Sequence, residues 1–204
     1  VSSPLGFDRS GERIYLIDSR GSDTGVLKAY STGSDSDYVA LASDPRADVA
    51  NVVMDPLSGT PQAVAFDYDR RSWTILDAKL GRDLDYLKTL TDGELSIVSR
   101  DQTDRKWIVG FLRDDGPYAY YLYDRTAGAA EFLFTNKPAL EDVPLSKMHS
   151  VVVSARDGLS LVSYLTLPPG DLVQRKLPMV LLVHGGPWAR DSWGYNPMHQ
   201  WLAN

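Results

Sequence analysis

The residues best suited to chemistry lie in His184-Gly185-Gly186-Pro187, which directly follows an apolar run, 179–183. A short apolar run bounded by Pro178 and a glycine pair is typical of a strand buried on both faces of a parallel sheet. Glycines at the end of such a strand let the backbone turn sharply and leave its N–H groups unshielded. Exposed N–H groups of this kind stabilise the oxyanion that forms during acyl transfer. The alternative is a tight turn without a chemical role, which a glycine pair also favours.

The residues after the glycine pair provide the setting that the acyl-transfer interpretation requires. An aromatic-rich loop, 188–195, is followed by Asn196-Pro197, which predicts a helix N-cap and a proline at the first helical position. Residues 198–202 then place apolar side chains at helical spacing. A strand, a glycine loop and a capped helix in this order predict the start of an α/β-hydrolase sheet, where such a loop supplies part of the oxyanion hole.

A catalytic nucleophile is the part of such a site that the sequence lacks. No serine lies in a Gly-x-Ser-x-Gly elbow: Ser160 follows Gly158 at the right spacing, but Val162 stands where the second glycine belongs. In this fold the nucleophile, acid and base all follow the oxyanion loop in the sequence. We therefore expect no catalytic Ser, Asp or His in the segment, place all three after Asn204, and expect the segment alone to be inactive.

Composition limits the partners. The 204 residues carry a net charge of −6 without a basic stripe, which argues against nucleic acid. No apolar run approaches the roughly 20 residues that span a membrane. The absence of cysteine excludes disulfides and thiolate metal sites, and the three histidines are scattered, so we expect no metal and no cofactor. A start at Val1 predicts a processed or excised segment of a soluble protein, either cytoplasmic or periplasmic.

The first part of the chain alternates short strands with polar, Asp-containing turns. The expected strands are 12–19, 26–31, 38–43, 51–54, 62–68, 72–76, 95–99, 107–112, 118–123 and 131–134. Four antiparallel strands recurring at about 40–50 residues predict β-propeller blades, here about two and a half of them. A β-sandwich is the alternative, but it needs longer connections. Leucines at helical spacing over 80–90, with Asp77 as the cap, predict one helix packed against a blade.

Two prolines and several charges in 137–144 predict a domain boundary. Residues 1–142 would form the C-terminal part of a β-propeller, and residues 143–204 the N-terminal part of an α/β-hydrolase catalytic domain. The second part would open with a hairpin of strands 149–155 and 159–167, which turns at Arg156-Asp157-Gly158.

The hairpin sequence ARDGLSLVSYLTLPPG (155–170) and the loop sequence LPMVLLVHGGPWARDSWGY (177–195) resemble the prolyl oligopeptidase family of serine peptidases. The acylaminoacyl peptidase and dipeptidyl peptidase branches are the most similar, because their loop also reads His-Gly-Gly-Pro. The resemblance implies a propeller lying over an α/β-hydrolase domain, with a Ser-His-Asp triad that cleaves peptide or acylaminoacyl bonds through an acyl-enzyme.

Carried over by position, Gly185 and Gly186 would form the oxyanion loop, with the N–H of Gly186 as the preferred donor. His184 and Pro187 would support the loop. Three aromatic residues would line a substrate pocket, unless they only pack: Trp188, Trp193 and Tyr195.

The resemblance implies a peptide substrate and allows a homo-oligomer, and it leaves exopeptidase against endopeptidase open. Arg190-Asp191 is either a local ion pair or a clamp on the loop. Two other functions remain: a carboxylesterase of the same fold, because the glycine loop serves esters equally, and a non-catalytic propeller that acts as a binding module.

Overall fold

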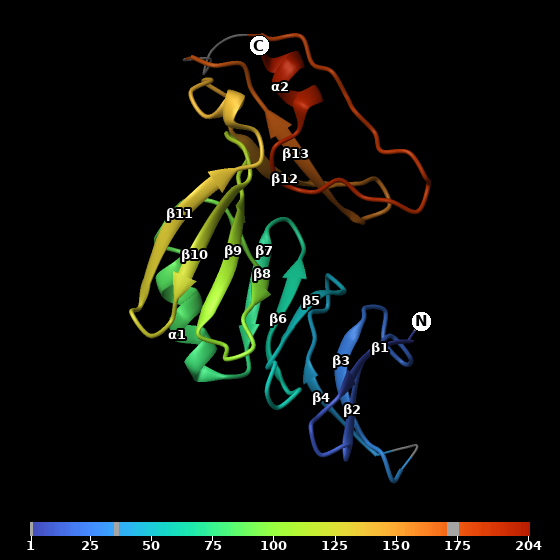
Figure 1. The fold of residues 1–204 in the computed structure, drawn as a ribbon. Coiled ribbons are helices and arrows are strands. Elements are labelled where there is room, and N and C mark those ends of the chain that lie inside the picture. Colours follow the sequence, from blue (N-terminus) through green and yellow to red (C-terminus); the bar gives the residue numbers. More distant parts are fainter. Residues whose placement is uncertain (1, 35–36, 171–175) are drawn as a thin grey trace.

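In a computed structural model, described here over residues 2–34, 37–170 and 176–204, three antiparallel sheets follow one another along the chain (Figure 1). Val1, from which a processed or excised segment was predicted, lies outside the described residues. The first sheet contains β1 (Ser2–Phe7), β2 (Arg13–Asp18), β3 (Val26–Ser31) and β4 (Tyr38–Ala42). The middle sheet contains β5 (Val49–Met54), β6 (Pro61–Asp67) and β7 (Arg71–Ile75). The last sheet contains β8 (Glu94–Arg100), β9 (Lys106–Leu112), β10 (Ala119–Asp124) and β11 (Ala129–Thr135).

The strand order within each of these sheets equals the order in the sequence, and every neighbouring pair is antiparallel. Such up-and-down sheets placed side by side are the blades of a β-propeller, so the predicted fold class of the first part is confirmed. All ten predicted strands are present. The structure adds β1, so the blades number three rather than two and a half, with four, three and four strands.

Helix α1 (Ala78–Leu87) follows β7, at the position where the other two blades have a fourth strand. Its N-cap is Asp77, whose carboxylate accepts a hydrogen bond from the Lys79 N–H at 2.9 Å, as predicted. The leucines at helical spacing, Leu80, Leu84 and Leu87, are fully buried. They belong to the hydrophobic core that also contains Trp107 of the last sheet, so the helix packs against a blade as expected.

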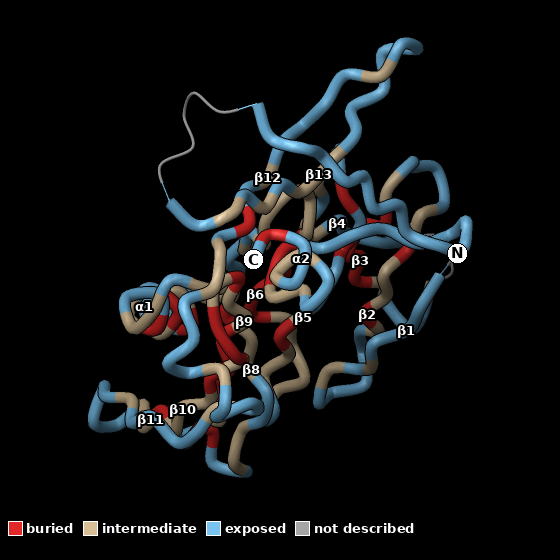
Figure 2. The backbone as a smooth tube through the Cα atoms, turned by 90° about the horizontal axis from the view of Figure 1, so that it is seen from above, coloured by how far each residue is buried: buried red, intermediate tan, exposed pale blue. Residues whose placement is uncertain are grey.

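The middle sheet lies between the other two, and its central strand β6 is buried on both faces (Figure 2). Ala63 belongs to the core shared with α1 and the last sheet. Val64 and Phe66 belong to the core shared with Leu27 of the first sheet. Because a strand exposes successive side chains on opposite faces, this alternation attaches one blade to each side of β6.

The C-terminal part of the chain begins with a two-stranded sheet of β12 (Met148–Ser154) and β13 (Ser160–Thr166). Its turn contains Gly158 at φ +88°, in agreement with the predicted hairpin. The chain closes with α2 (Pro197–Ala203), whose N-cap Asn196 accepts hydrogen bonds from Met198 N–H at 2.9 Å and His199 N–H at 3.2 Å. Both elements lie at one end of the blades (Figure 1).

The buried parallel strand predicted at 179–183 is wrong for this structure. These residues form no strand and are exposed, with Met179 at 84% of its maximal accessibility. A strand needs a neighbour to receive its backbone hydrogen bonds, and among the described residues none lies beside this run. The apolar composition of 179–183 indicates a tendency to be buried, but it does not provide the neighbouring strand that a sheet requires.

The candidate active-site loop and its attachment to the blades

The predicted oxyanion loop, residues 184–187, is exposed and lies outside every sheet. Gly186 has φ +140°, and a Cβ on it would lie 2.7 Å from the Trp188 nitrogen, so this backbone path requires glycine. Among the described residues, the N–H groups of Gly185 and Gly186 donate no hydrogen bond. The His184 ring contacts the loop itself, since its Nδ1 lies 3.0 Å from the Gly185 carbonyl oxygen. The loop therefore leaves two amides available to a ligand.

The three aromatic residues predicted to line a pocket lie in different surroundings. Trp188 is 98% exposed, next to the glycine loop. Trp193 is only 3% exposed, and its indole N–H donates to the carbonyl of Met148 at 2.8 Å. Tyr195 is half-buried and its backbone N–H donates to the Arg113 carbonyl at 2.7 Å. The structure does not gather them into one pocket, and Trp193 packs inside the protein.

The turn between β6 and β7, residues 67–71, makes direct contacts with the C-terminal part of the chain; we call this contact region the seam. Arg190 donates to the carbonyl of Asp67 at 2.7 Å and to the carbonyl of Tyr68. Of the two roles considered for Arg190, the clamp is the one observed: its guanidinium bonds these carbonyls and the Asp191 backbone rather than the Asp191 carboxylate.

The hairpin β12–β13 contacts the same turn. The Tyr164 hydroxyl donates to the Asp69 carbonyl at 2.8 Å, and the Ser150 hydroxyl donates to the Asp69 carboxylate at 3.2 Å. Burial raises the pKa of Tyr164, although the nearby charge of Arg190 opposes the change. On the other side of the turn, the Arg70 guanidinium lies 3.4 Å from the centre of the Trp193 ring, a cation–π contact.

A second attachment joins the β9–β10 turn to the C-terminal part. The buried Asp114 carboxylate accepts a hydrogen bond from the Met148 N–H at 2.7 Å, where β12 begins. The Gln200 side chain of α2 exchanges two hydrogen bonds of 2.8 Å with the Ser146 backbone and donates a third to the Asp114 carbonyl at 3.2 Å. These contacts connect sequence positions far apart, so the sequence alone gave no sign of them.

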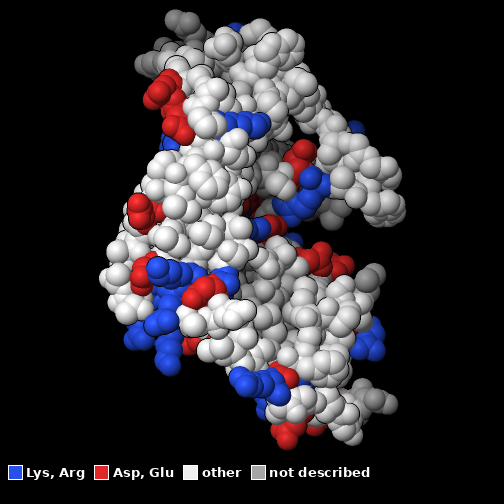
Figure 3. All heavy atoms as spheres, in the orientation of Figure 1, with Lys and Arg blue, Asp and Glu red and all other residues white. Residues whose placement is uncertain are grey.

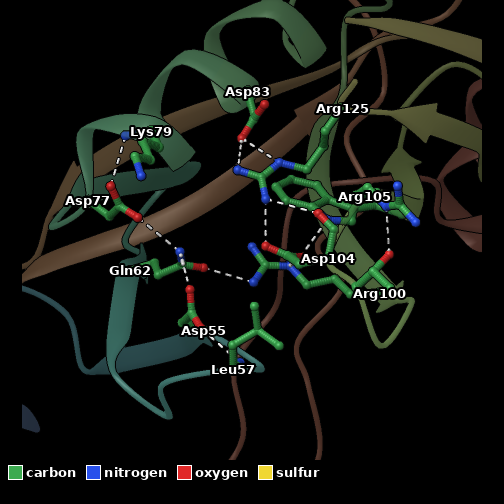
Figure 4. A network of polar contacts seen from close by, with 12 residues as sticks. Asp55, Leu57, Gln62, Asp77, Lys79, Asp83, Arg100, Asp104, Arg105 and Arg125 are labelled. Carbon is green, nitrogen blue, oxygen red and sulfur yellow. Dashed lines mark hydrogen bonds and ion pairs between the residues drawn. The ribbon is translucent and has the colours of Figure 1, made fainter. Parts of the chain in front are cut away.

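A buried polar network links the middle and last blades at their other end (Figure 4). The Gln62 amide donates to Asp55 at 3.1 Å and Asp77 at 2.9 Å, and its oxygen accepts from Arg100 at 2.8 Å. Asp104 then contacts Arg100 at 3.3 Å and Arg125 at 2.5 Å. Within the described residues, Arg100 Nε and Nη2 have no hydrogen-bond acceptor.

Electrostatics in this network follow from burial and charge. Burial lowers the pKa of Arg100, although the neighbouring Asp104 opposes the change. Burial also acts to lower the pKa of Arg125, but its hydrogen bonds to Asp83 and the nearby charge of Asp104 raise it above the ordinary value. The guanidiniums of Arg100 and Arg125 both contact the Trp107 ring, at 4.3 and 4.5 Å from its centre. The acids in contact with these guanidiniums, Asp83 and Asp104, form ion pairs with them. We therefore assign the network the structural role of joining the blades.

Charged side chains of both signs are interspersed on the face drawn in Figure 3. A shallow hollow beside α1 combines cations and acids; it is lined by Lys79, Arg82, Asp83, Thr103, Asp104, Arg105, Arg125 and Thr126. Within the described ranges, no group of three or more His, Cys, Asp or Glu side chains is placed to hold a metal ion. Among the described residues, no helix is long and apolar enough to cross a membrane.

The described chain thus consists of propeller blades followed by a segment that carries a glycine loop. Comparison with solved structures supports the fold. A Bacteroides ovatus protein assigned as a dipeptidyl aminopeptidase IV matches 94% of this chain and 30% of its own, with a TM-score of 0.59 and 16% identity. Prolyl oligopeptidase B from Galerina marginata matches 82% of this chain and 24% of its own, with a TM-score of 0.54 and 13% identity.

Sequence comparison identifies more particular relatives. The chain is 42% identical over its whole length to dipeptidyl aminopeptidase BIII of Pseudoxanthomonas mexicana, and 32% identical to dipeptidyl peptidase family member 6 of Caenorhabditis elegans. It spans about 30% of the length of each of these proteins. No family model matches the chain. The chain is thus similar in sequence to two dipeptidyl peptidases and in fold to prolyl oligopeptidases, and the predicted resemblance is confirmed.

Proposed function

We propose that this chain is part of a serine peptidase that cleaves peptide bonds, with dipeptides released from the N-terminus of the substrate as the first specificity to test. The observation that carries the proposal is the 42% identity to a dipeptidyl aminopeptidase, which extends across the blades and the glycine loop alike. The two named relatives share the dipeptidyl designation, which favours it over an acylaminoacyl specificity.

In the proposed reaction, a serine outside this chain attacks the scissile carbonyl carbon while its proton passes to a histidine, also outside this chain. The C=O double bond becomes a single bond, and the carbonyl oxygen becomes negatively charged. The N–H of Gly186, with Gly185 shaping the turn, donates a hydrogen bond to this oxyanion. Its suitability rests on two observations: the amide has no acceptor among the described residues, and the local backbone requires glycine. One such donor contributes about 2.7–4 kcal/mol to transition-state stabilisation. His184 and Pro187 keep the loop in shape, and Trp188 is available for contact with substrate.

The proposal is tested with the full-length protein that contains this chain and with residues 1–204 alone. We expect the longer protein to react stoichiometrically with a fluorophosphonate and to hydrolyse dipeptidyl amides faster than N-acetyl-aminoacyl amides or simple esters. Residues 1–204 should not be labelled. Labelling of a serine within 1–204, or failure of the longer protein to react with the probe, would overturn the proposal. Faster ester hydrolysis would point to the carboxylesterase alternative.

A further inference from the structure

We propose that Arg190 is a positioning residue that fixes the glycine loop against the β6–β7 turn of the middle blade. This inference rests on the proposed function for its catalytic consequence, but its structural content stands on contacts within the chain. Its starting point is that Arg190 is the first residue after Gly186 whose side chain bonds to a blade.

The chain changes from free to fixed at this residue. Before it, 184–189 are exposed, and the only backbone hydrogen bond there, among the described residues, joins Ala189 N–H to the Pro187 carbonyl at 2.9 Å. After it, Trp193 is buried and Tyr195 donates to the Arg113 carbonyl. Gly194 lies so close to β9 that a Cβ on it would be 2.7 Å from the Leu112 side chain. Arg190 therefore marks the point where the exposed loop, 184–189, ends and the attached segment begins.

The guanidinium suits this task because of its shape. Two of its nitrogens donate to two successive carbonyls, those of Asp67 and Tyr68, and Nε donates to the Asp191 carbonyl at 3.3 Å. A planar fork that bonds two acceptors at once fixes orientation as well as distance, which the single ammonium of lysine cannot do.

The receiving turn is itself held rigidly. Arg71 forms a two-point contact with Asp67, with both distances 2.8 Å, and its N–H donates to Glu94 at 2.9 Å. Arg70 contacts Glu94 at 3.2 Å while its guanidinium covers the Trp193 ring. Because the β6–β7 turn is held by these contacts, the two hydrogen bonds from the Arg190 guanidinium fix the loop relative to the middle blade. A loop carrying an oxyanion donor needs this, because misplacement by about 1 Å can cost about 100-fold in rate.

The test uses the full-length protein with four variants. Arg190→Gln removes the fork, and Arg190→Lys keeps the charge without it. Ser150→Ala removes a different seam hydrogen bond, the one to the Asp69 carboxylate, which does not involve Arg190. Arg156→Gln is the matched control, because Arg156 lies in the exposed hairpin turn, away from the seam.

We expect kcat to fall by about 10- to 100-fold in Arg190→Gln, with KM changed by less than about threefold because a positioning defect acts mainly in the transition state. Arg190→Lys should restore only a small part of kcat. Ser150→Ala and Arg156→Gln should retain kcat within about twofold. Equal kcat for Arg190→Gln and Arg156→Gln, an effect on KM alone, or an equal loss of kcat in Ser150→Ala would overturn the inference.

A second measurement separates this inference from the proposed function. Hydrogen exchange of the peptide covering residues 188–196 should be faster in Arg190→Gln than in wild type and unchanged in Arg156→Gln. If the wild-type protein lacks peptidase activity, the proposed function fails while the exchange result still decides whether Arg190 holds the loop. Unchanged exchange in Arg190→Gln would refute the clamp whatever the activity.

Discussion

Replacing Asp104 by asparagine should destabilise the protein strongly, because this buried carboxylate lies against two arginines. Asp104 is 7% exposed, and its carboxylate receives three groups: Arg125 at 2.5 Å, the Trp107 indole N–H at 2.7 Å and Arg100 at 3.3 Å. Asparagine keeps one acceptor oxygen but removes the charge that offsets two guanidiniums.

The magnitude follows from how the two arginines are placed. Breaking a buried ion pair by removing one partner costs about 3–5 kcal/mol. Arg125 keeps its contact with Asp83 at 2.7 Å and its side chain is 21% exposed, so its share of the loss is moderate. The Arg100 side chain is 8% exposed and would keep only neutral acceptors, the Met54 carbonyl and Gln62. We therefore expect a loss of about 3 kcal/mol in the free energy of unfolding.

The assay is urea unfolding followed by circular dichroism, with Asp142→Asn as the exposed control, expected to change stability by less than about 0.5 kcal/mol. A double-mutant cycle with Arg100→Met tests the cause. If the loss arises from an uncompensated buried cation, the two substitutions together should cost less than the sum of the single losses by about 1–3 kcal/mol. A loss below about 1 kcal/mol for Asp104→Asn, or additivity within the error of the cycle, would refute the reasoning.

Three further predictions concern the helix, the glycine next to β9 and one turn. Leu84→Ala should cost about 3–4 kcal/mol in unfolding free energy, because the side chain is fully buried between α1 and the last sheet; thermal unfolding with the exposed Leu159→Ala as control checks it. Gly194→Ala should destabilise more than Gly128→Ala in urea unfolding. Both glycines have positive φ, of +134° and +61°, but a methyl at 194 would meet Leu112, whereas one at 128 would enter open space. In the Asp101 turn, hydrogen bonds from the Lys106 N–H and the Thr103 hydroxyl lower the pKa of the carboxyl to about 2. A lowered folded-state pKa means that this stabilisation is complete above about pH 4 and is lost as the pH falls through about 2. Carboxyl NMR should show that midpoint, and a midpoint near 4 would contradict the hydrogen bonds.

The sequence was sufficient for elements whose signal is local. Alternation and turn residues located ten strands, and the leucine spacing with Asp77 located α1, because the burial of one face and the capping of one end are properties of a short segment. Strand β1 was missed because Ser2–Phe7 contains Pro4 and Gly6, shows no alternation, and has a register shift between these two residues. Edge strands of this kind obtain their conformation from a neighbour.

The seam and the blade network were beyond prediction for a different reason. Asp104 and Arg125 belong to Asp-Arg turns that recur along the chain, and each one alone indicates only a turn. Their pairing, like that of Arg190 with the Asp67 carbonyl, depends on which blades lie side by side. The run at 179–183 shows the converse case, since its composition predicts burial while its environment in the described structure provides no strand to pair with.

The backbone of Met148 has a consequence for how the two parts of the protein can move. Its N–H is held by Asp114 from a blade, and its carbonyl is held by the Trp193 indole from the segment after the glycine loop. Both attachments use main-chain atoms, so neither hydrogen bond requires a particular side chain at position 148. A rotation of the hairpin away from the blades would have to break these two hydrogen bonds first. Any hinge between the two parts therefore lies elsewhere along the chain.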